Sequence, residues 1–252
     1  MVGRWVGIAG LAALMTAYPA TRLCAQALDR TRPPALRPAP ALAVPAMQSV
    51  TLANGLPLYV VEMHEVPVVD IQLFVDAGSL RDPADLPGLA TFTANMLDEG
   101  AGQRTALDIA EEAGFLGARL FTFASFDMAG VALHVPKRRL EAALDLFADV
   151  ILRPTFPDSE VTRQRDLRKA QLLQLRDQPV QMANVAFPAI VFGERHPYGR
   201  PLGGTDSSVL KLDRERVRRF HETLYRPNNA RLMVVGDVTL AEARRLIEAR
   251  LG

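Results

Sequence analysis

Thr91, Ala94 and Asn95 have the spacing of a zinc-binding helix but not its side chains. In the pattern His-x-x-Glu-His, two imidazoles one helical turn apart share a Zn²⁺ ion, and the Glu accepts a proton from the metal-bound water. A hydroxyl and a carboxamide are poor substitutes for imidazole nitrogens, and alanine has no atom that accepts a proton. We therefore predict polar positions facing a cleft, with an unusual metal site or a different reaction as the alternatives.

The flanks of these positions resemble the inverted zinc motif of the M16 peptidases, the family of insulinase, pitrilysin and mitochondrial processing peptidase. Gly88-Leu89-Ala90, Phe92 and Met96-Leu97 fit that motif. The family takes a third zinc ligand, a Glu, from a later helix, and the matching stretch here runs from Gln164 to Pro179. The resemblance therefore implies that no zinc is bound by this chain, because the ligand positions fall on Thr91, Asn95 and Gln171.

Other landmarks of the same family follow in the same order along the chain. Asn54-Gly55 resembles the opening turn of the family domain, and Asp70 to Gly78 resembles its strand that ends in a Gly-Ser turn. The later landmarks are His196-Pro197-Tyr198-Gly199, Pro201-Leu202-Gly203-Gly204, Tyr225-Arg226-Pro227-Asn228-Asn229 and Val234-Val235-Gly236-Asp237-Val238. The resemblance covers residues 47–252. It implies an M16 N-terminal domain, with residues 200–252 as the possible start of the C-terminal region and the rest of that region absent.

The run Met96-Leu97-Asp98-Glu99-Gly100 is more similar to the non-catalytic subunits of bacterial M16 pairs than to the active ones. In such pairs one chain carries the zinc site and the other helps to enclose the peptide. The resemblance thus implies a chain without catalytic activity of its own, an active homologue that holds the zinc, and a peptide or unfolded polypeptide as substrate. An edge strand of the domain is expected to pair with extended substrate.

The hydrophobic patterns predict an α+β layered domain, and the resemblance specifies the M16-like (LuxS/MPP-like metallohydrolase) fold, with a mainly antiparallel sheet and helices on one side. The first three strands are expected to form a meander at one edge, since Asn54-Gly55 is a tight-turn dipeptide. Strands are predicted at residues 49–53, 57–62, 68–77, 118–126, 129–135 and 230–235. Helices are predicted at residues 87–97, 105–116, 140–151, 158–176, 213–225 and 240–251, with Thr105 and Asp158 as caps.

The N-terminus is typical of an export signal, which predicts a periplasmic or otherwise exported protein. Arg4 precedes a short apolar run at residues 6–17, and Ala25-Gln26-Ala27 offers a cleavage site. The run is short for a membrane span, so we expect a signal peptide over residues 1–27 and no membrane span after cleavage; a retained anchor is the alternative. Cleavage would also remove Cys24, the only cysteine. A proline-rich stretch then predicts an extended linker over residues 28–46.

Composition excludes several functions. The 252 residues carry a net charge of +1, and no basic stripe with interleaved aromatics occurs, so nucleic-acid binding is not expected. The sequence also contains no Gly-x-Ser-x-Gly elbow, phosphate-binding glycine loop or dinucleotide fingerprint.

The remaining metal-ligating residue types favour structural roles. Asp98 and Glu99 could form an oxygen-rich cation site, but carboxylates before a glycine are more often a solvated helix end. No two of the histidines have the spacing of metal ligands, and each is expected to be a structural or a surface residue: His64, His134, His196 and His221. Two alternatives to a non-catalytic subunit remain open, an active M16 zinc metalloendopeptidase and a stand-alone peptide-binding or chaperone-like module.

Overall fold

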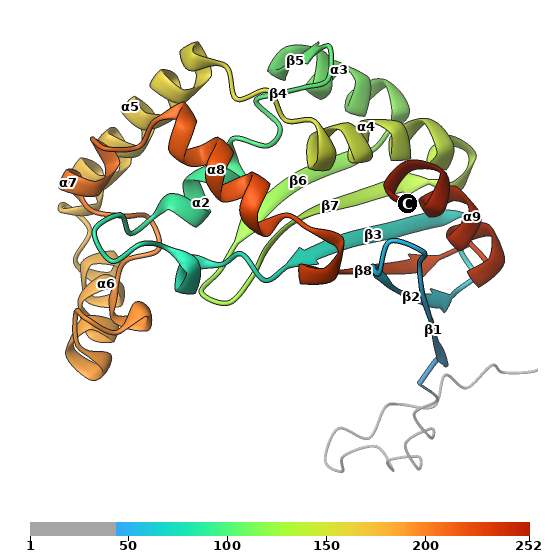
Figure 1. Cartoon of the computed structure of the whole chain (residues 1–252), viewed down its shortest axis with the longest axis horizontal. Coiled ribbons are helices and arrows are strands. Elements are labelled where there is room, and N and C mark those ends of the chain that lie inside the picture. Colours follow the sequence, from blue (N-terminus) through green and yellow to red (C-terminus); the bar gives the residue numbers. More distant parts are fainter. Residues whose placement is uncertain (1–43) are drawn as a thin grey trace, which may run out of the picture. The chain divides into compact units, whose positions relative to one another are not determined.

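Alternating apolar residues build a six-stranded sheet in which only the β2–β8 pairing is parallel. The computed structural model describes residues 44–252 (Figure 1), and these form one compact unit. In spatial order the strands are β1 (Met47–Thr51), β2 (Pro57–Glu62), β8 (Ala230–Gly236), β3 (Val68–Val75), β7 (Ala129–Pro136) and β6 (Arg119–Ala124). The expected signal peptide 1–27, Cys24 and residues 28–43 of the expected linker lie outside the described residues.

The sheet has one buried and one open face, because strand side chains alternate between the two. In β3, Val69, Ile71, Leu73 and Val75 are buried, whereas the residues between them are only half-buried. The buried face is covered by helices, and α4 (Leu140–Leu152) and α9 (Leu240–Leu251) lie side by side over it (Figure 1). The mainly antiparallel sheet with helices on one side is thus confirmed.

Further helices extend the unit beyond the sheet. They are α2 (Leu89–Asn95), α3 (Ala106–Leu116), α5 (Asp158–Leu175), α6 (Pro179–Phe192), α7 (Asp206–Val209) and α8 (Arg214–Leu224), and a small hairpin joins β4 (Gly100–Ala101) to β5 (Arg104–Thr105). Thr105 caps α3 as predicted, since its side chain accepts a hydrogen bond from the Asp108 amide. No helix of residues 44–252 is long and apolar enough to cross a membrane.

The predicted meander of the first three strands is wrong. β1 and β2 form the expected hairpin, but β8 lies between β2 and β3 and pairs with both. Leu58 of β2 is opposite Leu232, and Ile71 of β3 is opposite Val234. The turn signal at Asn54-Gly55 is local, whereas this insertion joins segments more than one hundred residues apart in the chain, as Figure 1 shows.

Two helix predictions also need correction, and α6 was not predicted. Asp158 is the first residue of α5 rather than its cap, a position that Pro157 occupies. The helix predicted over 87–97 is shorter, because Gly88 takes a left-handed φ of 94° and α2 begins only at Leu89. A side chain at Gly88 would also come within 2.7 Å of Gly204. The sequence patterns did not specify α6, although they placed a mostly helical region after residue 137.

Candidate functional site

The α2 helix carries the three degenerate positions and is packed against β6, β7 and α8. Its core-facing residues are Leu89, Ala90, Phe92, Thr93 and Ala94. The next two residues, Met96 and Leu97, are also fully buried. Within α2, only Thr91 and Asn95 are partly exposed, and they form one narrow stripe. All other side chains of the helix are packed in the core.

Asp82 orients the start of α2 from the preceding loop. Its carboxylate oxygens accept hydrogen bonds from the backbone amides of Gly88 and Ala90, each at 2.7 Å. These amides begin the helix and have no partner within it, so the carboxylate satisfies them and complements the helix dipole. Asp82 is buried, and this burial raises the pKa of its carboxyl to about 6, against the lowering effect of the two amides.

The raised pKa of Asp82 predicts a measurable pH dependence of stability. The folded protein holds this proton more tightly than the unfolded chain, in which the pKa of Asp is about 4. The stabilisation is therefore complete below about pH 4 and is lost as the pH rises to about 6, a change of about 2 to 3 kcal/mol. The free energy of unfolding of Asp82→Asn minus that of wild type should therefore be higher at pH 7 than at pH 4 by that amount. Urea unfolding at both pH values measures this difference.

The exposed Asp85 provides the control for this experiment, because the side chain of Asp85 is 78% exposed. The stability difference between Asp85→Asn and wild type should be the same at both pH values. A constant difference for Asp82→Asn as well would show that the Asp82 carboxyl titrates normally in the folded protein.

Thr91 and Asn95 lie one turn apart on the partly exposed stripe of α2. Ala94 lies outside this stripe and is buried. Ala94 has an exposure of 0%, so the position of the proton-accepting Glu in the motif faces the packed core here. The hydroxyl of Thr91 is buried and has no hydrogen-bond partner within residues 44–252. Asn95 is the last residue of the helix.

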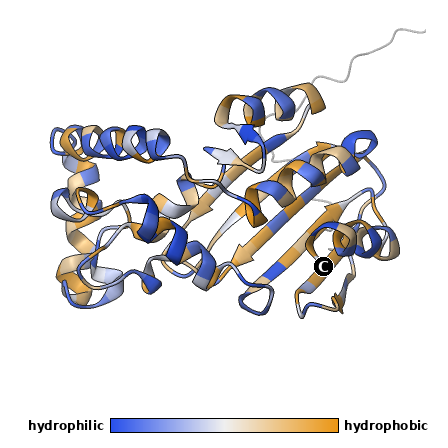
Figure 2. Cartoon of the chain, turned by 45° about the horizontal axis from the view of Figure 1, so that its top comes forward, coloured by the Kyte–Doolittle hydropathy of each residue, from blue (hydrophilic) through white to orange (hydrophobic). Residues whose placement is uncertain are grey.

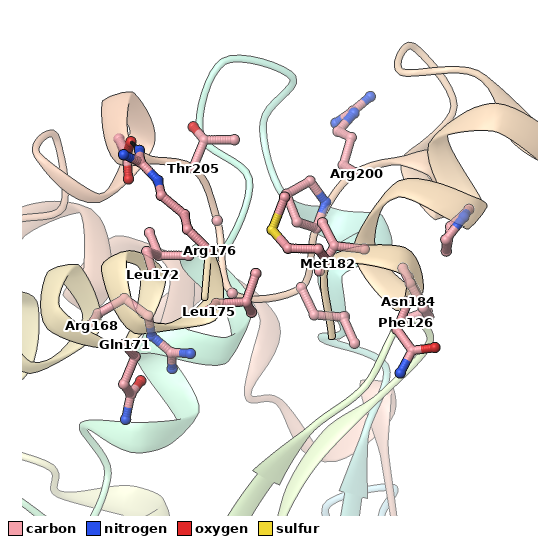
Figure 3. Close-up of a pocket in the computed structure, with 17 residues that line it drawn as sticks. Phe126, Arg168, Gln171, Leu172, Leu175, Arg176, Met182, Asn184, Arg200 and Thr205 are labelled. Carbon is pink, nitrogen blue, oxygen red and sulfur yellow. Dashed lines mark hydrogen bonds and ion pairs between the residues drawn. The ribbon is translucent and has the colours of Figure 1, made fainter. Parts of the chain in front are cut away.

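Gln171 lies on α5 and lines a cavity of about 540 Å³. Figure 3 shows Gln171 and Arg168 projecting from the same helix. Among the described residues, the lining of this cavity includes neither Thr91 nor Asn95. The cavity thus contains only the third of the three degenerate ligand positions.

The side chains at these positions do not fit a zinc ion. They supply one hydroxyl and two carboxamides, with no imidazole, thiolate or carboxylate, which are the groups that bind Zn²⁺ in proteins. Within residues 44–252, no group of three or more His, Cys, Asp or Glu side chains is placed to hold a metal ion. We therefore expect no zinc at these positions of α2 and α5.

The acidic pair after α2 is divided between two environments. The carboxylate of Glu99 accepts hydrogen bonds from the side chains of Arg163 and Gln164 on α5. Burial and the neighbouring Glu99 raise the pKa of Asp98 to about 6. Glu99 therefore links the end of α2 to α5, where its charge is matched by an arginine.

The four histidines lie in separate places and have structural partners. The Nδ1 atom of His64 is 2.8 Å from Asp237, and that of His134 is 2.8 Å from Asp70 on the neighbouring strand. His196 accepts a hydrogen bond from the amide of Tyr198. His221 is buried with its Nε2 atom 2.9 Å from the carbonyl oxygen of Ile151.

Two residues of this region, Asp82 and Arg168, were not predicted from the sequence. Asp82 caps α2 across a loop, and no local pattern indicates such a contact. Arg168 precedes Gln171 by three residues, so the helical spacing places both on one face of α5. That spacing was the available signal, but the importance of Arg168 depends on the cavity in front of it.

The model of the family described as insulinase (peptidase family M16) matches residues 59–206, and that of the peptidase M16 inactive domain matches residues 211–252. An uncharacterized zinc protease of Mycobacterium leprae is 31% identical over 202 residues, which cover 80% of this chain and 45% of that protein. The chain thus spans about half the length of the curated relatives it matches.

Solved structures show the same fold. A peptidase M16 inactive domain from Pseudomonas fluorescens superposes with a TM-score of 0.78 at 29% identity, covering 81% of this chain and 50% of that one. The periplasmic protease PqqL of Escherichia coli gives a TM-score of 0.74 at 22% identity, covering 84% of this chain and 24% of that one. The chain belongs to the insulinase family, peptidase family M16.

Proposed function

We propose that this chain is an exported, non-catalytic M16 subunit that associates with a zinc-bearing homologue and helps to enclose its peptide substrate. One observation carries the proposal. The α2 helix keeps its place against the sheet while Thr91, Ala94 and Asn95 offer neither a zinc ligand set nor a proton acceptor. In this proposal the zinc belongs to the homologue, and this chain contributes surface.

An apolar surface on α6 supports the association. The helix has no buried residue, although most of its side chains are apolar, and Figure 2 colours it mainly as hydrophobic. Ile190 is 80% exposed and Phe187 is 66% exposed. Exposed apolar surface of this kind is typical of an interaction site, since its removal from water stabilises a complex.

The outermost strand β6 supports a role in holding substrate. Within the described sheet, β6 pairs with β7 on one side only, which leaves backbone groups on its other side available. An extended peptide could add to this edge through main-chain hydrogen bonds with little dependence on its sequence. Phe121 on β6 is half-exposed and could contact side chains of such a peptide.

Co-expression with an exported homologue that retains His-x-x-Glu-His tests the proposal. The two chains should co-purify, and cleavage of an unstructured peptide should require both. Zinc should be found in the homologue and in the pair, but not in this chain alone. Removing the first His of the homologue should abolish cleavage, whereas Thr91→Ala and Asn95→Ala in this chain should leave cleavage unchanged. Zinc and chelator-sensitive cleavage in this chain alone would overturn the proposal in favour of an active metalloendopeptidase, the activity in the names of its relatives.

The α6 surface makes a sharper prediction for this pair. Ile190→Lys places a charge in the proposed interface, so the dissociation constant of the pair should rise about tenfold or more. Gln181→Lys is the matched control, because it adds the same charge at an exposed polar position of the same helix. Light scattering after size-exclusion chromatography measures both. Equal effects of the two substitutions would exclude Ile190 from the interface.

A stand-alone peptide-binding module is the second candidate, and the cavity beside Gln171 favours it. This candidate predicts peptide affinity in the isolated chain and no dependence on a homologue. Failure to form a pair, together with retained peptide binding, would select it.

A further inference from the structure

The cavity that contains Gln171 lies between two helices and a loop. One face of α5 supplies Arg168, Gln171, Leu172 and Leu175, which follow helical spacing. Met182, Val185 and Pro188 of α6 also line it, and residues 200–206 contribute the loop. Figure 3 labels Met182 of the helix and Arg200 and Thr205 of the loop. Its volume of about 540 Å³ is within the range of small-molecule and peptide side-chain sites.

Arg168 is the only charged group of this lining that lacks a partner among residues 44–252. Arg176 forms an ion pair with Asp206, and Arg200 donates to the backbone carbonyls of Asp82 and Arg195. A side chain at Gly203 would place its Cβ atom 3.3 Å from the Nη1 atom of Arg168. Burial lowers the pKa of the Arg168 guanidinium, and in the part of the chain that the structure describes no acidic group compensates for the lost hydration.

The surroundings of Arg168 favour a monoanion with an apolar body. A guanidinium presents paired N–H donors that match a carboxylate, and in a partly dry site such a bond is stronger than in water. Because Arg176 and Asp206 neutralise each other and Arg200 donates to backbone carbonyls, the guanidinium of Arg168, unpartnered among the described residues, matches one negative charge, whereas a doubly charged phosphate would require more donors. Beyond the charge, the lining consists mainly of apolar side chains such as Leu172, Leu175 and Met182.

Gln171 completes this arrangement. Its amide group can donate a hydrogen bond to an anion, whereas the Glu expected at this position in zinc-binding relatives would repel the anion and could pair with Arg168. We propose that the cavity binds a carboxylate carried on an apolar chain, with the carboxylate at Arg168 and Gln171 and the chain against Leu172, Leu175 and Met182. The proposal rests on the peptide-handling part of the proposed function, and identifies its ligand as an apolar peptide C-terminus; a fatty acid shares this chemistry.

Fluorescence anisotropy with a labelled Ala/Leu hexapeptide tests the inference on the purified chain. The peptide with a free C-terminal carboxylate should bind about tenfold more tightly than its C-terminal amide. Arg168→Gln and Gln171→Glu should each abolish this preference. The matched controls Lys169→Gln and Gln174→Glu make the same charge changes on exposed positions of α5 outside the cavity and should preserve it.

Competition with decanoate distinguishes the sources of the carboxylate. Displacement of the peptide extends the site to alkyl carboxylates, and lack of displacement restricts it to peptide termini; both agree with the proposal. Equal binding of the acid and the amide by the wild-type chain would overturn the proposal. An equal preference for the acid in Arg168→Gln and Lys169→Gln would also overturn it. Pair formation with the homologue is measured separately, so loss of one result does not imply loss of the other.

Discussion

Ala94→Glu is expected to lower the free energy of unfolding by about 4 kcal/mol or more, because it buries a carboxylate in a closed apolar core. Ala94 is completely buried, and α2 packs its core-facing side against the sheet and α8. The longer side chain must also displace neighbours, and overpacking of a core alone costs about 1 to 3 kcal/mol. Urea unfolding at pH 7 measures the change.

Asn95→Glu is the control for this substitution. Asn95 is partly exposed at the end of α2, so its replacement should cost no more than about 1 kcal/mol. The result also bears on function. If Ala94→Glu is strongly destabilising, then Thr91→His, Ala94→Glu, Asn95→His and Gln171→Glu together will not recreate a folded zinc site. A cost near that of Asn95→Glu would mean that the core can still accommodate a proton acceptor at this position.

Asp149→Ala is expected to destabilise the protein by about 3 kcal/mol, because it removes a buried carboxylate and the charged hydrogen bonds that it accepts from two arginines. Asp149 is 5% exposed and accepts hydrogen bonds from the side chains of Arg104 and Arg153. Arg104 also pairs with Glu112 of α3 at 2.5 Å, which moderates the loss. The network joins the β4–β5 hairpin, which follows α2, to α4. Urea unfolding of the variant measures this link.

Asp145→Ala removes a comparable carboxylate from the same helix and provides the comparison. Its side chain is 58% exposed and pairs with Arg250 of α9 at 2.6 Å. An exposed pair contributes about 1 kcal/mol or less, so this variant should be much less affected. If the two variants have equal stability, the charges of Arg104 and Arg153 are satisfied by other means in the folded protein.

The sequence by itself determined the fold class, the family and most of the secondary structure. Period-two patterns in β3 and helical spacing in α4 are local consequences of backbone geometry, so they can be read from the chain without knowing its neighbours. The replacement of ligand side chains at Thr91, Asn95 and Gln171 was also visible, since their chemistry depends on residue type alone.

Only the tertiary structure decided how these parts meet. The insertion of β8 between β2 and β3, the capping of α2 by Asp82 and the burial of Ala94 all join residues that are separated in the chain. The cavity at Arg168 belongs to the same class, because its walls come from two helices and a loop. Such contacts depend on packing between distant segments, and local propensity carries no information about them.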